Sequence, residues 1–348
     1  MAVRIAIAAL AVCAASLSGV RRVTDAEVMR VHRSALLIDT HNDLPENMIG
    51  GRKAATTLAG LQAGGVGAVF FAAYVSPSYG TRGGAARRAL EMIDVIRQDI
   101  VARQPEGFEL ALSAVDIEAA HRRGKVAVLI GVEGGYAIED SLRVLRCLYA
   151  LGARYMTLTH MKPTNWADAS GYEKPEPEVH HGLTRFGKEV VREMNRLGML
   201  VDVSHVSDKT FWDVLGASSK PVFASHSSCR ALADMPRNMT DEMIAAMAKK
   251  GGVIQINAGC GFLKRGARAT VADVVAHIDH VVKIAGTGAV GIGTDFDGVE
   301  CTPVGLEDVS KFPNLTRALL EKGYTPGDIR KIYGENLLRV MRSVEGKI

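Results

Sequence analysis

Short apolar runs recur along this chain and alternate with segments of helical periodicity. In the helical segments apolar residues return every three to four positions, whereas in the short runs they are nearly continuous. A short continuous apolar run is typical of a strand that is buried on both faces of a parallel sheet. We therefore predict strands over residues 36–43, 67–75, 126–133, 154–160, 199–205, 221–226, 253–257 and 289–295.

Helices are predicted before and between these strands. Their ranges are residues 25–33, 85–103, 141–151, 183–197, 208–215, 241–250 and 271–285, with further helices at the C-terminal end. A long polar loop is expected over residues 161–182. Eight strands that alternate with helices match a single (β/α)8 TIM-type barrel better than an open doubly wound sheet. The predicted fold class is therefore α/β.

Acidic and histidine side chains stand where the apolar runs end. Seven residues of metal-ligand or acid/base type occupy these positions: His41, Asp43, Glu133, His160, His205, His226 and Asp295. The carboxyl ends of parallel strands converge on one crevice, where ligands bind. The sequence therefore predicts one shared site and a barrel of the metal-dependent hydrolase kind.

The spacing of these residues predicts how they divide among metal ions. His41 and Asp43 are two positions apart in one strand, so their side chains point to the same face and can share one ion. His205 and His226, from two later strands, can serve a second ion. Glu133 lies between the pairs in chain order, and its two oxygens can bridge two ions. Nitrogen and oxygen ligands without thiolate suit zinc best, with manganese, cobalt or iron as alternatives.

Taken singly, a histidine at a strand end is more often a hydrogen-bonded structural residue than a metal ligand. The histidines outside the strand ends are expected to be of that structural kind: His32, His121, His180, His181, His277 and His280. The combination of a His-x-Asp pair, a glutamate and two more histidines on separate strands is what favours a metal site.

Composition and motifs exclude several other classes. Hydrophobic residues make up 47% of the 348 residues and the net charge is only +4, as expected of a globular protein with an ample core. The basic residues are scattered, so no nucleic-acid partner is expected. Residues 286–291 match G-x-G-x-x-G but precede a strand, which argues against a dinucleotide site. The chain has neither a G-x-S-x-G nucleophile elbow nor a P-loop.

Residues 1–19 have the layout of a secretory signal peptide. Arg4 supplies the positive charge, residues 5–15 are apolar, and small residues follow, with cleavage expected near residues 12–14. The stretch is shorter than the about 20 residues of a membrane span. We therefore predict an exported, periplasmic or secreted enzyme whose catalytic barrel covers residues 20–348, with no stable membrane span after processing. An uncleaved membrane anchor and a buried N-terminal helix are the alternatives.

The cysteines give little chemistry. Cys147, Cys229, Cys260 and Cys301 are widely spaced and form no C-x-x-C pair, which excludes a cysteine-based zinc ribbon. Their spacing does not determine a disulfide pairing, so buried free thiols are the expectation.

Eight short motifs resemble those of one known family, the membrane (renal) dipeptidases, which are binuclear zinc peptidases. They are Asp-Thr-His-Asn-Asp-Leu-Pro at 39–45, Gly-Val-Glu-Gly-Gly at 131–135, Thr-Leu-Thr-His at 157–160, Val-Ser-His at 203–205, Ser-His-Ser-Ser at 225–228, Pro-Arg-Asn-Met at 236–239, Gly-Thr-Asp-Phe-Asp-Gly at 293–298 and Gly-Glu-Asn-Leu-Leu-Arg-Val at 334–340. The resemblance extends over nearly all of the chain after residue 19.

The resemblance implies the same ligand division and adds three roles. It places His41 and Asp43 on one zinc, His205 and His226 on the other, and Glu133 between the two. It further implies that His160 faces the scissile carbonyl, that Arg237 binds the substrate carboxylate and that Asp295 is the proton shuttle. Two departures bear on substrate preference. Residues 257–259 replace an aromatic side chain found in many relatives, which predicts a more open pocket wall, and the loop at 160–166 also differs.

The expected function is hydrolysis of free dipeptides by a hydroxide that bridges two Zn2+ ions. The rival enzymes are other binuclear-metal amidohydrolases: an N-acyl amino acid hydrolase, a lactonase or a phosphotriesterase. Such sites often use a carboxylated lysine as the bridge, whereas the third strand here ends in Glu133. A metal-binding protein without activity is the non-enzymatic alternative. Asp297 competes with Asp295 as the base, and a homodimer stays open.

Overall fold

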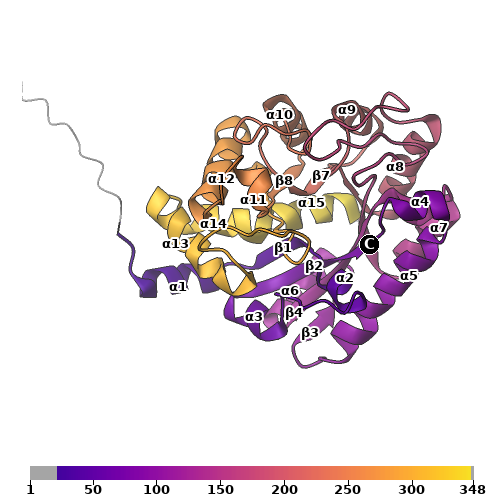
Figure 1. Ribbon diagram of the computed structural model, residues 1–348. Coiled ribbons are helices and arrows are strands. Elements are labelled where there is room, and N and C mark those ends of the chain that lie inside the picture. Colours follow the sequence, from indigo (N-terminus) through magenta and orange to yellow (C-terminus); the bar gives the residue numbers. More distant parts are fainter. Residues whose placement is uncertain (1–21, 346–348) are drawn as a thin grey trace, which may run out of the picture.

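Eight parallel strands form a closed barrel in the computed structural model, which describes residues 22–345 (Figure 1). The barrel strands are β1 Leu37–Asn42, β2 Val66–Tyr74, β4 Val126–Glu133, β5 Ala153–Thr157, β6 Leu200–Asp202, β7 Phe223–Ser227, β8 Val253–Ile256 and β9 Val290–Ile292. Neighbours pair in the order β2-β1-β9-β8-β7-β6-β5-β4, and pairing of β2 with β4 closes the ring. The predicted (β/α)8 barrel is confirmed. The predicted signal peptide lies outside the described residues.

Helices surround the barrel (Figure 1). The larger ones are α1 Asp25–Arg33, α5 Ala85–Asp94, α6 Ala114–Arg122, α7 Leu142–Ala150, α8 Arg185–Leu197, α9 Asp208–Ala217, α10 Asp241–Lys249, α12 Val271–Ala285, α13 Phe312–Lys322 and α15 Asn336–Glu345. Many are preceded by a serine or threonine whose hydroxyl accepts a hydrogen bond from the amide three residues later. Thr184 does so for α8 and Ser207 for α9. Such caps satisfy amide groups that have no partner inside the helix.

Short elements decorate the loops of the barrel. They are α2 Leu44–Ile49, α3 Leu58–Ala63, α4 Ser78–Arg82, α11 Cys260–Leu263 and α14 Pro326–Arg330. Apart from α14, which belongs to the predicted C-terminal helices, none of these was predicted, nor were α6 and the strand β3 Phe108–Leu110, which pairs with the first half of β4. The predicted helix over 85–103 is also not uniform, because it continues beyond α5 as a π-helix over Val95–Ala102. No helix within residues 22–345 has the length and apolarity needed to cross a bilayer.

Alternation along β4 explains how an acidic residue reaches the barrel interior. Val128 and Ile130 pack in the outer core, whereas Leu129 packs in the cluster that contains Phe70 and Tyr155. Gly131 lies on this inner face beside Tyr155, and a Cβ there would come within 1.9 Å of the tyrosine ring. Two positions further on, Glu133 points the same way, because alternate residues of a strand share a face. The strand thus ends with its carboxylate above a packed aromatic layer.

Candidate metal centre and active site

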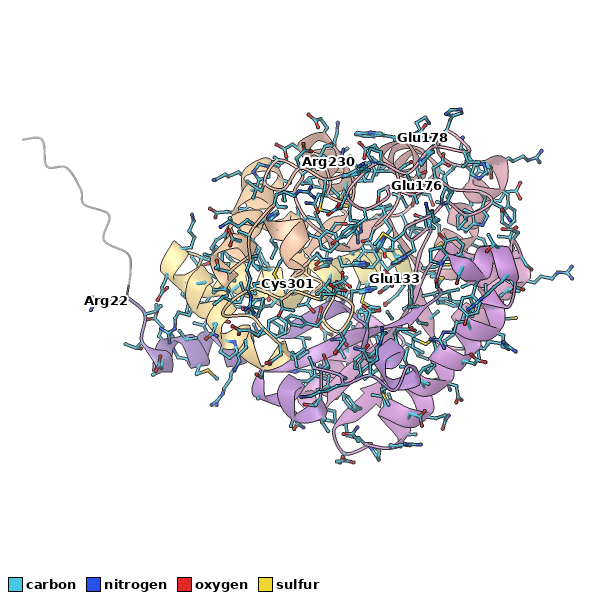
Figure 2. The ribbon with its side chains drawn as sticks, viewed as in Figure 1. Arg22, Glu133, Glu176, Glu178, Arg230 and Cys301 are labelled. Carbon is cyan, nitrogen blue, oxygen red and sulfur yellow. A yellow bond between two sulfur atoms is a disulfide. The ribbon has the colours of Figure 1, made fainter. Side chains whose placement is uncertain are left out.

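The seven predicted site residues meet at the carboxyl ends of the strands. His41 lies in β1, Glu133 ends β4 and His226 lies in β7, while Asp43, His160, His205 and Asp295 follow the ends of β1, β5, β6 and β9. All seven are buried or nearly so, and five of them line a cleft of about 650 Å³: Asp43, Glu133, His160, His205 and Asp295. Figure 2 labels Glu133 in the middle of the molecule. The structure thus brings the seven residues together at one end of the barrel.

Glu133 presents its two carboxylate oxygens to two different groups of histidines. Its Oε2 lies 3.5 Å from His41 Nε2. Its Oε1 lies 3.1 Å from His205 Nε2 and 3.3 Å from His226 Nε2. One carboxylate oxygen thus faces each half of the site. This is the arrangement expected of a ligand shared by two cations.

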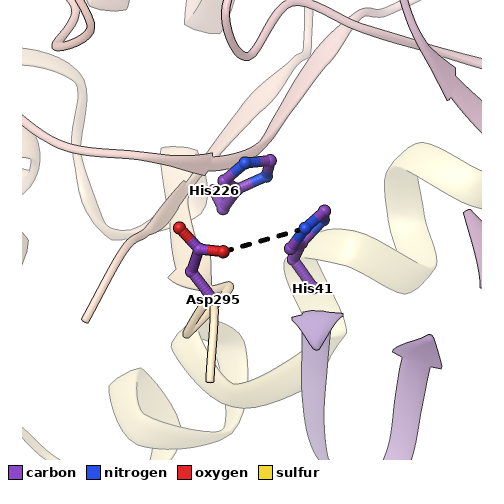
Figure 3. Close-up of side chains that lie close together, drawn as sticks. All are labelled: His41, His226 and Asp295. Carbon is purple, nitrogen blue, oxygen red and sulfur yellow. Dashed lines mark ion pairs between the residues drawn. The ribbon is translucent and has the colours of Figure 1, made fainter. Parts of the chain in front are cut away.

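The ligand atoms fall into three overlapping groups, each compact enough to hold an ion. The groups are His41, Asp43 and Glu133; Glu133, His205 and His226; and His41, His226 and Asp295, with the atoms in each group within 4.8 Å of one another. Asp43 Oδ2 lies 3.3 Å from His41 Nε2. Figure 3 shows the third group, in which Asp295 Oδ1 lies 3.9 Å from the same nitrogen.

The donor atoms of this cluster need a cation. His41 Nε2 is buried without a hydrogen-bond partner, although it lies among three carboxylates. The Nε2 atoms of His205 and His226 are only 2.9 Å apart and both face the same oxygen of Glu133. Buried polar atoms without partners cost free energy, and imidazole nitrogen with carboxylate oxygen is a donor set that divalent transition metals accept. The residues therefore fit a metal centre.

The local electrostatics of Glu133, His205 and His226 suit metal binding. Burial, together with the neighbouring Arg237, lowers the pKa of His205 and of His226 well below the usual value, so these rings are neutral. Burial would raise the pKa of Glu133, but His41, His160 and the two facing histidines outweigh it and hold that pKa well below its usual range. Neutral imidazoles and an ionised carboxylate are the protonation states that ligate metals.

A second layer of hydrogen bonds fixes the ligand rings. Tyr155 Oη lies 2.8 Å from His41 Nδ1. Ser225 Oγ lies 2.7 Å from His226 Nδ1 and 2.6 Å from Asp202 Oδ2. Because each ring is held through Nδ1, its Nε2 points into the site. Such partners determine the tautomer and the orientation of a metal-binding histidine.

Sequence reasoning missed this supporting layer. Asp202 lies inside β6 and accepts hydrogen bonds from the Ser204 and Ser225 amides at 3.0 and 2.8 Å. Asp39 in β1 accepts from the Thr294 amide and hydroxyl at 2.8 and 2.6 Å, and burial raises its pKa to about 6. A carboxylate inside an otherwise apolar run was the available signal, since a buried charge needs partners.

His160 lies on the open side of the metal ligands. Its Nε2 is 3.6 Å from Glu133 Oε1, and its ring packs edge-on against Tyr74 with centroids 4.9 Å apart. Burial lowers the pKa of His160. Both rings line the cleft, so His160 is placed to meet a bound molecule. Tyr74, at the end of β2, is a lining residue that the sequence analysis did not identify.

Arg237 is a buried cation without a carboxylate partner in the described chain. Its Nη1 donates to Ser227 Oγ at 2.8 Å and its Nη2 donates to the His226 carbonyl at 2.6 Å, while Nε has no partner. Within residues 22–345 no ion pair involves this guanidinium. Burial lowers its pKa, with Asp295 among the negative charges that oppose the shift. Arg237 does not itself line the cleft, but its guanidinium lies 5.6 Å from the ring of Phe262, which does, and an unpaired buried cation there is suited to an anionic ligand.

The two candidate bases after β9 have different surroundings. Asp295 Oδ2 accepts a hydrogen bond from Asn257 at 2.8 Å, and burial, reinforced by the charges of Asp43 and Glu133, raises its pKa to about 7. A bound cation would oppose that shift. The Asp297 carboxylate instead accepts from the Ala55 and Thr56 amides at 2.6 and 3.0 Å. Asp297 therefore anchors a loop, and Asp295 is the carboxylate that faces the candidate ligand His41.

The backbone is strained where these side chains enter the site. His205, Asp295 and Asp297 have φ angles of 66°, 63° and 67°, in the left-handed region that residues other than glycine rarely adopt. Such conformations cost about 1–3 kcal/mol each and cluster at functional sites. Here they turn the chain directly after β6 and β9.

The rim of the cleft differs from the prediction in two respects. Cys260 and Cys301 form a disulfide, so the expectation of buried free thiols is wrong for this pair; Cys229 is free and buried as expected, whereas Cys147 is free but exposed. The wall at residues 257–259 is also not open. A Cβ on Gly259 would lie 2.7 Å from Phe262, whose ring occupies the available space. Phe262 and Tyr172 both line the cleft.

Three of the histidines predicted to be structural, His32, His277 and His280, make hydrogen bonds away from the metal-ligand cluster. His32 lies 2.7 Å from Thr316 Oγ1, and His277 accepts from the Cys229 amide at 3.0 Å. His280 contacts Asp241 at 2.8 Å. These three contacts tie helices to loops or to one another, as expected of residues outside the metal site.

Comparisons with known proteins agree with this geometry. A model of the membrane dipeptidase family, peptidase family M19, matches residues 25–347. The chain is 38% identical to dipeptidase 3 of Mus musculus over 338 residues, which are 92% of this chain and 66% of that protein. It is 39% identical to dipeptidase 3 of Homo sapiens over 332 residues, or 90% and 66%. The match thus spans just under two thirds of these relatives.

A solved structure is similar over its whole length. A metallopeptidase from Rhodobacter sphaeroides, crystallised with a phosphinate mimic of the dipeptide L-Ala-D-Ala, superimposes with a TM-score of 0.81 at 27% identity. The match covers 89% of this chain and 99% of that one.

Proposed function

This chain belongs to the membrane dipeptidase family, and from that premise we propose that it is a zinc-dependent dipeptidase that hydrolyses the peptide bond of free dipeptides. The observation that carries the proposal is the position of the Glu133 carboxylate. One of its oxygens faces His41, and the other faces His205 and His226. Such a carboxylate suits a binuclear centre, in which each half of the site holds one ion.

We assign the ligands of two Zn2+ ions as follows. His41 and Asp43 would hold one ion, His205 and His226 would hold the other, and Glu133 would offer one oxygen to each. Zinc fits because all five ligands offer nitrogen or oxygen, although other divalent transition metals accept the same donors. When bound, a pair of such ions acidifies water to near neutrality and polarises a carbonyl group.

The protein's own groups then position the substrate and move its protons. Arg237 offers a planar fork to the C-terminal carboxylate, which restricts the enzyme to very short peptides. His160 donates to the carbonyl oxygen as negative charge develops on it. Asp295 accepts the proton of the attacking water and returns it to the leaving amine. Two contacts support this assignment. Asp295 lies 3.9 Å from the His41 ring, whereas Asp297 accepts a hydrogen bond from the Ala55 amide in a loop.

The metal content is the first test. Purified protein should hold close to two zinc ions per chain, as measured by elemental analysis, and a chelator should abolish dipeptide hydrolysis until zinc is restored. Full activity after complete metal removal would overturn the proposal.

Arg237 provides the test of the substrate class. Arg237→Met should lower kcat/KM on free dipeptides by roughly 30- to 5,000-fold while zinc content is retained. This corresponds to a loss of about 2–5 kcal/mol of transition-state stabilisation. Amidating the substrate C-terminus should reproduce the loss in the unaltered enzyme. Arg103→Met is the matched control, because Arg103 forms only an exposed ion pair with Asp99. Equal rates on free and amidated dipeptides would remove Arg237 from this role.

The same assay separates the rival amidohydrolases. An N-acyl amino acid hydrolase would also use Arg237 but would prefer substrates whose amino group is acylated. A lactonase or phosphotriesterase would be indifferent to Arg237→Met. Dipeptides that are hydrolysed faster than their N-acyl counterparts would favour the dipeptidase.

We further propose export, with residues 1–19 as the signal peptide and residues 20–348 as the catalytic domain. The charged, apolar and small-residue order of the first 19 positions supports this. Sequencing the N-terminus of the protein from its producing cells tests it. An intact Met1 would favour the membrane-anchored alternative or an N-terminal helix of the domain.

A further inference from the structure

The long polar loop between β5 and α8 carries an aromatic ring into the cleft. Tyr172 lines the cleft yet is 41% exposed, which is unusual for a large ring. Gly171 before it has a φ of 75°, and a Cβ there would lie 2.2 Å from the Lys174 carbonyl, so only glycine fits this turn. The turn is tied to the metal site, because the Ser170 amide donates to the His205 carbonyl at 2.8 Å.

Tyr172 is connected to the buried cation through one intervening ring. It packs edge-on against Phe262, with ring centroids 5.4 Å apart and planes at 89°. The guanidinium of Arg237 lies 5.6 Å from the centroid of the same Phe262 ring. Phe262 thus contacts both side chains, of which Arg237 is buried and Tyr172 is partly exposed.

The hydroxyl of Tyr172 is available to a ligand. Among residues 22–345 it has no hydrogen-bond partner, whereas the hydroxyls of Tyr136 and Tyr155, near the same site, are both bonded. A Cβ on Gly261 would come within 3.3 Å of this oxygen, so the absent side chain leaves room around it. Burial and the charge of Asp295 raise the pKa of Tyr172, while Arg237 opposes the shift. The phenol therefore stays protonated and within electrostatic range of both groups.

We propose that Tyr172 is a further substrate-binding residue, whose hydroxyl donates a hydrogen bond to the C-terminal carboxylate of the dipeptide beside Arg237. The assignment rests on the proposed dipeptidase function. Its ring closes the outer side of the subsite that receives the C-terminal residue by packing on Phe262, which fills the space beside Gly259. Arg237 supplies the charge from below, and Tyr172 supplies a directed donor from the loop.

The test uses the zinc-loaded full-length enzyme and two variants of the ring. Tyr172→Phe removes only the hydroxyl, and it should raise KM for free dipeptides about 10-fold or more, as expected for a lost hydrogen bond to a charged group, with little change in kcat. Tyr172→Ala also removes the ring and should raise KM further. Tyr149→Phe is the matched control, because Tyr149 lies near the end of α7 and stacks on Arg154 outside the cleft.

A binding measurement isolates the carboxylate. A phosphinate dipeptide mimic should bind Tyr172→Phe about 10-fold more weakly than the unaltered enzyme in calorimetry, whereas a mimic without the terminal carboxylate should bind both equally. Equal weakening of both mimics, or an unchanged KM in Tyr172→Phe, would overturn the assignment while leaving the dipeptidase intact. Failure of the unaltered zinc-loaded enzyme to hydrolyse any dipeptide would overturn both proposals.

Discussion

The floor of the cleft and its rim are built in different ways. On the floor, His41, Glu133 and His226 lie in strands and are buried, and further hydrogen bonds hold the two histidine rings. On the rim, Tyr172 and Phe262 lie in a loop and a one-turn helix, and contact each other from distant parts of the sequence. The floor is therefore rigid and specified by the barrel, whereas the rim depends on a few contacts between loops.

This difference separates chemistry from substrate choice. A metal centre needs ligands held in place by strands and by a second layer of hydrogen bonds. Loops above a rigid barrel can change without disturbing it, which is why they commonly set specificity. We therefore expect substitutions on the floor to change metal content and kcat, and substitutions on the rim to change KM.

Glu133→Gln should have the largest effect, because it removes the charge shared by both halves of the floor. Loss of metal-ion catalysis costs several kcal/mol of transition-state stabilisation, so turnover should fall by at least about 10³-fold. Elemental analysis should show fewer than two zinc ions per chain. Glu46→Gln is the rim control, since Glu46 lines the same cleft but pairs with Arg88. Two retained ions with near-normal turnover in Glu133→Gln would refute the bridging role.

Asp295→Asn tests whether this floor carboxylate transfers protons or holds metal. The amide keeps the shape but cannot accept a proton, so kcat should fall by about 10²–10⁴-fold with both zinc ions and KM retained. Asp297→Asn is the matched control, and it should lower stability more than turnover, because Asp297 anchors residues 55 and 56. A zinc ion lost in Asp295→Asn would mean that Asp295 is chiefly a ligand.

The floor could be predicted from sequence because strand alternation and strand ends leave a local signature. Each ligand follows an apolar run, and parallel strands bring such ends together whatever their separation in the chain. The predicted strands at 154–160 and 199–205 nevertheless ran too far, since β5 ends at Thr157 and β6 at Asp202. The Asp202 carboxylate accepts a hydrogen bond from the Ser204 amide. That amide is then not available to pair with the neighbouring strand, so β6 ends at Asp202.

The rim could not be predicted because its contacts are not local. Cys260 begins the one-turn helix α11 and Cys301 lies in a loop 41 residues later, and no periodic pattern encodes the path of either segment. Tyr172 lies in a polar loop without apolar periodicity, and its partner Phe262 is 90 positions away. Gly259 was a signal that could have been used. A glycine beside a cleft leaves space for a ring from elsewhere in the chain, and Phe262 fills that space.

Asp202→Asn tests the second layer of hydrogen bonds beneath the floor, and it should have a smaller effect than Glu133→Gln or Asp295→Asn. Asp202 bonds Ser225, which in turn holds the His226 ring. Loss of such a partner typically weakens metal affinity by about 10–100-fold. Competition with a zinc indicator would measure this, and turnover should recover when zinc is added in excess. Unchanged zinc affinity would mean that the histidine is held by packing alone.

Removing the disulfide should affect the rim and leave the floor unchanged. In Cys260→Ala/Cys301→Ala the loops after β8 and β9 lose their covalent link, and the free energy of unfolding should fall by about 2–4 kcal/mol in denaturant titrations. Zinc content and kcat should be retained, because the proposed metal ligands lie in or just after β1, β4, β6 and β7 and not in these loops. KM should rise, since Phe262 lies two residues from Cys260 and supports both Arg237 and Tyr172. Cys147→Ala, at an exposed free thiol, is the control that should change none of these quantities. If the double variant instead lost its zinc, floor and rim would be one structural unit, and the separation of chemistry from substrate choice would fail.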